Sequence, residues 1–122
     1  MTTAQALKVL LVEDDSAMQA VLRTLLEIEG FLVSTAPGRI CQQELVAFIK
    51  GEKPDVMLMD VHLRETSGIE VLRELRNDNE FAQTKVIMTS GSDVKEKCLA
   101  AGANNFILKP FMPDELINKL RG

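Results

Sequence analysis

Four short apolar runs constrain the fold of this chain most strongly, because each of them ends at a polar residue of a different chemical kind. The runs and the residues that follow them are 9–12 with the acidic triplet 13–15, 56–59 with Asp60, 86–89 with Ser90, and 106–108 with Lys109. Near-continuous apolar runs of this length are typical of strands buried on both faces of a parallel sheet. Parallel strands end at the same edge of a sheet, so we expect the four polar ends to lie together.

Segments with helical periodicity lie between the runs. The first is expected to be capped by Asp15 or Ser16 and to end at Gly30, and the last is expected to begin at Pro113, whose missing N–H costs nothing at the first helical position. The predicted inner faces, in chain order, are Met18, Val21, Leu22, Leu25 and Leu26; Ile40, Leu45, Val46 and Ile49; Ile69, Val71, Leu72 and Leu75; Val94, Cys98 and Leu99; and Leu116, Ile117 and Leu120.

A further strand predicted at 31–36 completes a series of five strands that alternate with five helices. This order predicts an α/β fold, a doubly wound five-stranded parallel sheet with helices on both faces. A polar connection is expected at 77–84. The 122 residues suit a single domain over 1–122, with residues 1–6 as a flexible N-terminal tail.

The bulk properties argue against several classes of protein. The net charge of −4 disfavours nucleic-acid binding by this chain, which needs clustered lysines and arginines. No apolar stretch approaches the roughly 20 residues that cross a bilayer. The polar start at 1–6 also lacks the regions of a signal peptide, so we expect no membrane association and a cytoplasmic location. Cys41 and Cys98 lack metal-site or redox spacing and are expected to be free thiols.

Three carboxylates at the expected site would need a cation. Glu13, Asp14 and Asp60, held within a few ångströms of one another, would repel by several kcal/mol. Lys109 offsets only one of these charges. A hard cation with oxygen ligands, Mg²⁺ before Ca²⁺ or Mn²⁺, would remove the excess, and Mg²⁺ would keep positions open for phosphate oxygens. Asp15 is left out of this site, because the residue after an acidic pair often caps the following helix.

The same set of side chains suits phosphoryl transfer. The Asp60 carboxylate can attack phosphorus and become an acyl phosphate. The charge of the transferred group spreads over three oxygens. Mg²⁺ can bind one, the Lys109 ammonium another, and the Ser90 hydroxyl or nearby backbone N–H groups the third. His62 is the only histidine and has no second histidine or cysteine nearby, so it makes a poor zinc ligand, and its side chain is expected to be exposed.

With these residues placed, the chain resembles the receiver domain of two-component response regulators, the CheY-like family, from about Lys8 to Leu120. The motifs that carry the resemblance are VLLVEDD at 9–15, VMLMD at 56–60, Gly68 eight residues after Asp60, Ser90 thirty residues after Asp60, and LKPF at 108–111. The resemblance implies a flavodoxin-like (βα)5 fold with strand order 2-1-3-4-5.

The resemblance also implies how a metal would be bound. Asp14 would be a direct ligand of Mg²⁺, and Glu13 would act through water. Asp60 would be both the phosphorylation site and a metal ligand. His62 would contribute its backbone carbonyl oxygen.

The remaining implied roles concern the phosphoryl group and the signal. Ser90 and Lys109 would bind phosphoryl oxygens, and Phe106 would be the aromatic switch residue whose ring moves inward when Ser90 shifts. The fourth helix, fifth strand and fifth helix would form the signalling face. The phosphoryl donor would be a sensor histidine kinase or a histidine phosphotransfer protein, and a downstream protein target or output domain would read the state. Such a domain catalyses only its own phosphorylation and dephosphorylation.

Two of the departures from the family pattern concern loop segments. The family often has Met-Pro after the phosphoacceptor, whereas this chain has Leu63 and Arg64, so the loop loses a rigid proline and gains a cation. The second helix is preceded by an unusual Pro-Gly-Arg at 37–39, for which the sequence offers no functional account.

Three other functions compete with this interpretation. A flavodoxin-like cofactor module would need backbone N–H groups and hydroxyls after the first strand, where this chain has acids. A Mg²⁺-dependent phosphatase with an aspartyl nucleophile would be expected to have a second aspartate where His62 stands. An interaction module that has lost phosphorylation would not need the complete set of groups found here.

Overall fold

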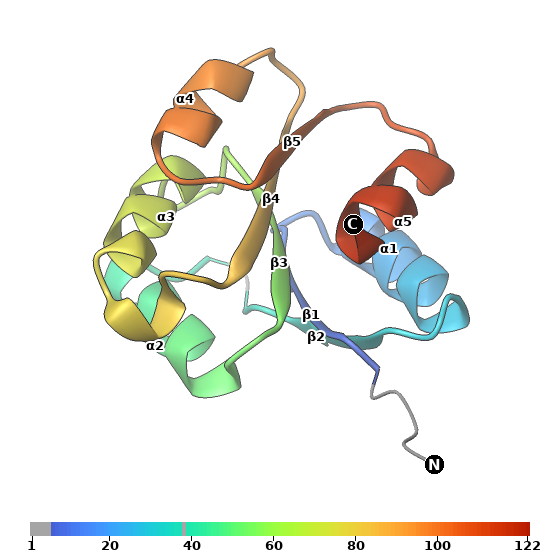
Figure 1. The fold of residues 1–122 in the computed structure, drawn as a ribbon, viewed down its shortest axis with the longest axis horizontal. Coiled ribbons are helices and arrows are strands. Elements are labelled where there is room, and N and C mark those ends of the chain that lie inside the picture. Colours follow the sequence, from blue (N-terminus) through green and yellow to red (C-terminus); the bar gives the residue numbers. More distant parts are fainter. Residues whose placement is uncertain (1–5, 38) are drawn as a thin grey trace.

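The fold is a five-stranded parallel sheet with helices on both faces, as Figure 1 shows. The computed structural model describes residues 6–37 and 39–122. The strand order is β2-β1-β3-β4-β5, which confirms the predicted fold class and strand order. The strands are β1 (Lys8–Val12), β2 (Leu32–Thr35), β3 (Val56–Asp60), β4 (Lys85–Ser90) and β5 (Asn105–Leu108).

The described residues also form five α-helices and one short 3₁₀ helix, of which α5 follows the last strand. They are α1 (Ser16–Ile28), α2 (Gln42–Glu52), α3 (Gly68–Arg76), η1 (Asn79–Phe81), α4 (Lys95–Ala100) and α5 (Pro113–Arg121). Of the tail expected at 1–6, only Ala6 lies within the described residues, and Gly38 also lies outside them. None of the helices in the described ranges is long and apolar enough to cross a membrane.

Local sequence accounts for the ends of the helices. The carboxylate of Asp15 accepts a hydrogen bond from the backbone N–H of Met18 at 3.1 Å, so Asp15 is the N-cap of α1, as predicted. After α1 the chain turns at Gly30, whose φ of 94° is unfavourable for other residues. Helix α5 begins at Pro113, as predicted.

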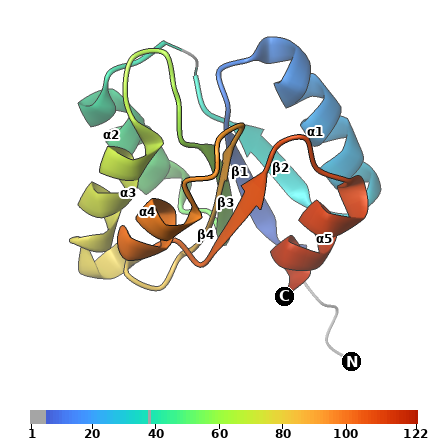
Figure 2. The ribbon, with the colours of Figure 1, turned by 90° about the horizontal axis from the view of Figure 1, so that it is seen from above.

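The two faces of the sheet are covered by different helices, α2, α3 and α4 on one side and α1 and α5 on the other (Figures 1 and 2). Successive residues of a strand point to opposite faces. Accordingly, Leu10 and Val12 of β1 belong to the apolar cluster under α2–α4, whereas Val9 and Leu11 belong to the cluster under α1 and α5. Burial on both faces explains why these strands read as continuous apolar runs.

Two residues predicted to face the core are exposed instead. Val21 is 63% exposed and Leu99 is 42% exposed. Each is adjacent in sequence to a fully or nearly buried residue, Leu22 or Cys98, and neighbouring residues lie about 100° apart around an α-helix. Each helix therefore buries a narrower stripe than its apolar residues suggest.

The connection at 77–84 is more ordered than its polar sequence predicts. It contains η1, and Phe81 is 3% exposed within the cluster under α2–α4. Ile40 is not on the second helix, contrary to the prediction: it precedes α2, and it packs, partly buried, against the same cluster. Cys41 is exposed, Cys98 is buried, and both are free thiols.

Candidate functional site

The carboxyl ends of four neighbouring strands bring the predicted site residues to one edge of the sheet. Val12 pairs with Met59, Asp60 pairs with Thr89, and Ser90 pairs with Leu108. Glu13, Asp60, Ser90 and Lys109 are therefore the last residues of their strands or the first residues after them. The strand that follows β1 in the sequence lies on one side of it, and β3 lies on the other. The site is beside this reversal of strand order, which is a common place for ligand sites in doubly wound sheets.

Lys109 is the centre of the charged cluster. Its Nζ lies 2.8 Å from Oδ2 of Asp60 and 3.5 Å from Oε2 of Glu13. The side chains of Asp60 and Glu13 are only 12% and 10% exposed. One ammonium group thus serves two poorly solvated carboxylates, and one negative charge remains in excess.

The excess charge changes the protonation of the two carboxyl groups. Burial, together with the neighbouring Asp60, raises the pKa of Glu13 from 4.5 to about 7. Burial alone would also raise the pKa of Asp60, but hydrogen bonds from Glu13, Lys109 and the His62 backbone outweigh it and lower that pKa. The pair holds one proton most readily on Glu13, which leaves the Asp60 carboxylate ionised.

The backbone after β3 fixes the Asp60 side chain. The N–H of His62 donates to Oδ1 of Asp60 at 3.1 Å, while the imidazole of His62 is exposed, as expected. Gly68 lies so close that a Cβ at this position would be 2.2 Å from the Asp60 carbonyl oxygen. Any residue larger than glycine would push the α3 end away from Asp60, which gives a steric reason for glycine eight residues after the aspartate.

Asp14 is paired with a different cation from the one that Glu13 and Asp60 share. Its Oδ2 accepts a hydrogen bond from the backbone N–H of Arg64 at 2.7 Å and lies 3.7 Å from Nε of the same residue. Within 6–37 and 39–122, no three His, Cys, Asp or Glu side chains are gathered as a ready-made metal site. The acids therefore form two groups, one paired with Lys109 and one with Arg64.

The donor set still fits a hard divalent cation. Glu13 and Asp60 present carboxylate oxygens, and the raised pKa of Glu13 reports a place where further positive charge would be stabilised. Asp14 is adjacent to Glu13 in the chain and would complete the set if its carboxylate left Arg64. The residues present are compatible with Mg²⁺.

Ser90 is buried beside Lys109. It is 1% exposed, its Oγ accepts a hydrogen bond from the Ser92 N–H at 3.1 Å, and its carbonyl oxygen accepts one from the Lys109 N–H at 2.8 Å. Phe106 is 8% exposed and lies in the cluster under α2–α4, so its ring is directed into the protein. The hydroxyl and the ring both belong to the β4–β5 side of the site.

Sequence reasoning missed two polar residues of the site. Gln19 of α1 donates its side-chain N–H to the carbonyl oxygen of Glu13 and so holds the acidic loop. Thr89 is 3% exposed, has no hydrogen-bond partner for its hydroxyl among the described residues, and lines a small cavity with Asp60 and Lys109. Side chains alternate along a strand, so Thr89 faces the side of the sheet opposite to Ser90. This alternation could have predicted that Thr89 carries a hydroxyl to that side of the site.

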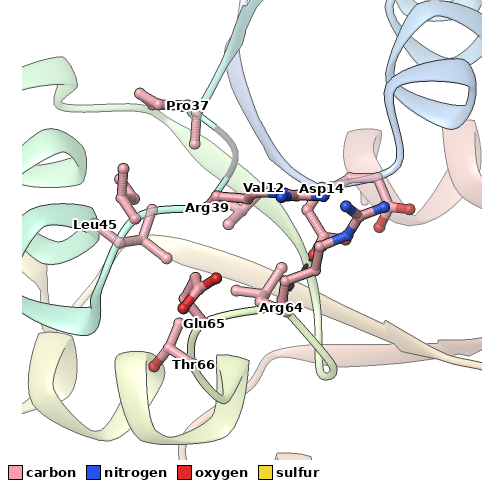
Figure 3. Close-up of a pocket in the computed structure, with 12 residues that line it drawn as sticks. Val12, Asp14, Pro37, Arg39, Leu45, Arg64, Glu65 and Thr66 are labelled. Carbon is pink, nitrogen blue, oxygen red and sulfur yellow. Dashed lines mark hydrogen bonds and ion pairs between the residues drawn. The ribbon is translucent and has the colours of Figure 1, made fainter.

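A pocket on the outer side of the acidic loop contains two arginines. Arg39 and Arg64 line it together with Asp14, Glu65 and Thr66. Figure 3 shows both guanidinium groups directed toward the Asp14 end of this pocket. Arg39 adopts a φ of 50°, which belongs to the left-handed region. Two of the departures from the family pattern, at Arg39 and Arg64, thus lie at one pocket.

The fold and this edge of the sheet define a class of protein, and comparison with known families agrees with it. Residues 9–121 match the model of the response regulator receiver domain. The chain belongs to this family, whose members act in two-component signalling.

Curated relatives include transcriptional regulators of bacteria. The chain is 38% identical over 117 residues to the cell cycle transcriptional regulator CtrA of Caulobacter vibrioides, a match that covers 93% of this chain and 48% of CtrA. It is 34% identical over 116 residues to the phosphate regulon transcriptional regulatory protein PhoB of Pseudomonas aeruginosa, covering 93% of this chain and 49% of PhoB. The chain therefore spans about half the length of these relatives.

Solved structures of receiver domains superpose closely. A response regulator from Chloroflexus aurantiacus gives a TM-score of 0.85 at 27% identity and covers 95% of both chains. The receiver domain of the sensor histidine kinase PA1611 from Pseudomonas aeruginosa gives 0.83 at 28% identity, again over 95% of both chains. That second structure is described with a magnesium ion coordinated in its active-site cleft.

Proposed function

We propose that this chain is the phosphoacceptor of a two-component phosphorelay and that Asp60 receives the phosphoryl group in a Mg²⁺-dependent reaction. The single observation that carries the proposal is the Lys109 ammonium, which lies 2.8 Å from Asp60 and 3.5 Å from Glu13 at the carboxyl edge of the sheet. An ion pair with a purely structural role needs only one acid. Two acids and one base leave one negative charge in excess, which a divalent cation would balance, and that cation and the ammonium together would attract a phosphoryl group.

The transfer is a substitution at phosphorus. An ionised Asp60 oxygen attacks the phosphorus of a phosphohistidine, the new P–O bond forms as the N–P bond breaks, and the histidine nitrogen leaves with the bonding pair. The low pKa of Asp60 keeps the nucleophile ionised. The His62 N–H and the Lys109 ammonium hold one oxygen each before attack, which fixes the plane of the carboxylate.

Charge on the transferred group is balanced by donors from the chain. Lys109 turns from the carboxylate toward a phosphoryl oxygen, and the Ser90 hydroxyl binds another. Mg²⁺, when bound by Asp14, Asp60, the His62 carbonyl oxygen and, through water, Glu13, would neutralise acid charge and bind a phosphoryl oxygen. In the hydrolysis that follows, water attacks phosphorus, the P–O bond to Asp60 breaks and inorganic phosphate leaves, so Asp60 returns to its starting state and the modification is temporary.

The phosphorylated state would be read on the α4-β5-α5 face. Ser90 and Lys109 belong to the strand ends on this side of the sheet, and Phe106 lies on β5 with its ring buried. A movement of the Ser90 hydroxyl toward the phosphoryl group would change the packing around Phe106 and shift the population of two arrangements of this face.

The partners follow from this chemistry. The donor is a sensor histidine kinase or a histidine phosphotransfer protein, and the reader is a downstream protein target or an output domain. The relatives CtrA and PhoB are transcriptional regulators about twice as long as this chain. We propose no direct nucleic-acid contact by the chain itself, whose net charge is −4.

Intact-mass analysis after incubation with acetyl phosphate and Mg²⁺ tests the proposal. The parent protein should gain one phosphoryl group, and Asp60→Asn should gain none. Asp114→Asn is the matched control, because it makes the same chemical change at an exposed acid in the first turn of α5, and it should gain one group like the parent.

Two results would count against the proposal. The first is an unmodified parent under conditions in which a known receiver domain is modified. The second is repeated release of phosphate from a phosphoester by catalytic amounts of the protein, which would favour the phosphatase interpretation.

A further inference from the structure

The carboxylate of Asp14 contacts both the backbone and the side chain of Arg64. The backbone N–H of Arg64 donates to Oδ2 at 2.7 Å, and Nε of its guanidinium group lies 3.7 Å from the same oxygen. The Asp14 side chain is 15% exposed and that of Arg64 is 54% exposed. The carboxylate is therefore poorly solvated, whereas the guanidinium group can leave for water at little cost.

The loop between β3 and α3 presents Arg64 to Asp14. The Leu63 N–H donates to the Thr66 carbonyl oxygen at 3.2 Å, and His62 forms a bridge with Ser67. These bonds close the loop into a tight turn with Arg64 near its tip. A proline at this position would have no N–H to donate and no charge, so both contacts with Asp14 depend on the departure from the family pattern.

The contacts with Arg64 keep Asp14 apart from the other two acids. Glu13 and Asp60 share Lys109, and no three His, Cys, Asp or Glu side chains among the described residues are gathered so that they could hold a metal ion. A metal bound by Asp14 and Asp60 together needs the Asp14 carboxylate to turn toward Asp60. That movement breaks the ion pair with Arg64, so the two cations exclude each other at Asp14.

We propose that Arg64 competes with the divalent metal for Asp14 and so weakens metal binding in the resting protein. The inference rests on the proposed function, because the metal is the one required for phosphorylation. Metal binding would then release the guanidinium group and with it the tip of the β3–α3 loop. Arg39 lines the same pocket and adds a second positive charge near Asp14, which disfavours a further cation there.

The dissociation constant for Mg²⁺ tests the competition. The chain has no tryptophan or tyrosine, so isothermal titration calorimetry or an NMR titration of backbone amides would be used. Arg64→Ala should bind Mg²⁺ about two- to five-fold more tightly than the parent, the range expected for loss of one exposed ion pair. Arg23→Ala, which removes an equal charge from an exposed α1 pair with Glu27, should leave the constant unchanged.

A second readout follows Arg64 itself. Its Nε–H resonance in the parent should shift during the Mg²⁺ titration with the same dissociation constant as the amides near Asp60. An Arg64→Ala protein that binds Mg²⁺ no more tightly than the parent would overturn the proposal, and so would an equal gain in Arg23→Ala.

The outcomes separate this proposal from the proposed function. If the parent binds Mg²⁺ and is phosphorylated while Arg64→Ala shows no gain in affinity, only the competition fails. If neither protein binds Mg²⁺, both proposals fail. Weaker binding by Arg64→Ala would also overturn the competition, since it would mean that Arg64 orients Asp14 for the metal.

Discussion

Lys109 carries one positive charge and faces two carboxylates, and this imbalance governs the chemistry of single residues at the site. Glu13 and Asp60 are equally poorly exposed, yet their pKa values move in opposite directions. Asp60 has the nearer ammonium and a backbone N–H, so it keeps its charge. Glu13 takes up the proton that the pair binds, which leaves the proposed nucleophile ready to react.

The shift at Glu13 predicts a pH-dependent effect on stability. A carboxyl whose pKa rises from 4.5 to about 7 on folding stabilises the protonated folded state, and this contribution is lost as the pH rises through about 7. Glu13→Gln keeps a neutral side chain at every pH. Without metal, it should exceed the parent in free energy of unfolding by about 1 to 3 kcal/mol near pH 8, and by much less near pH 5.

Urea unfolding of both proteins in EDTA at the two pH values measures this difference. The pKa of Asp60 is lowered from 3.8 and the pKa of Lys109 is raised from 10.5, so neither side chain titrates between pH 5 and pH 8. A stability difference that is the same at both pH values would contradict the assignment of the proton to Glu13.

Residue roles were predictable where the cause is local in sequence. Asp15 follows an acidic pair and precedes a helical repeat, and it caps α1 as expected. The contact between Asp14 and Arg64 joins residues fifty positions apart, and it depends on a side-chain direction that strand periodicity does not determine. The sequence therefore indicated a cation near the site but not which acid it would bind.

At the scale of elements, Arg76 joins parts of the chain that the sequence pattern left separate. From the last turn of α3, its guanidinium group donates to the carbonyl oxygens of Gly102 at 2.9 Å, Phe81 at 2.8 Å and Thr84 at 2.7 Å. It also donates to Oδ1 of Asn104 at 3.0 Å. One side chain thus ties α3 to η1 and to the turn before β5.

Replacing Arg76 should therefore destabilise the fold. Arg76→Met keeps much of the apolar length but leaves several half-buried carbonyl oxygens without their donor, and we expect a loss of about 2 to 3 kcal/mol in the free energy of unfolding. Arg73→Met is the matched control on the same helix, because Arg73 is exposed and has an i,i+3 pair with Glu70 at 2.7 Å. Its loss should stay below about 0.5 kcal/mol.

Urea unfolding at neutral pH compares the two variants. Equal losses in Arg76→Met and Arg73→Met would mean that the contacts of Arg76 contribute no more than a surface pair does.

Element boundaries followed the sequence closely where caps and breakers are present, as at Asp15 and Pro113. Burial was harder to predict than helix position. Val21 and Leu99 belong to apolar repeats but fall outside the stripe that the sheet can cover, whereas Phe81 is buried from a polar segment. The three cases share one cause: which part of an element meets the sheet is decided by tertiary packing, which a local pattern does not contain.

At the scale of the whole molecule, the order β2-β1-β3-β4-β5 places the acidic loop after β1 next to Asp60 at the end of β3. The alternation of strands and helices predicts this class of sheet, and the family resemblance supplies the order. The two apolar layers on its faces make the sheet a rigid base for a site made of loops. A single domain over 1–122 stays a prediction, as does the role of each site residue.

The central claim is that the Asp60 carboxylate itself becomes an acyl phosphate. After incubation with acetyl phosphate and Mg²⁺, borohydride reduces an aspartyl phosphate to homoserine, and peptide mass spectrometry then identifies the modified position. The account predicts homoserine at position 60, dependent on Mg²⁺ and on the phosphodonor. Homoserine at another aspartate, or a phosphoryl group that survives borohydride on a serine or threonine hydroxyl with Asp60 intact, would contradict it.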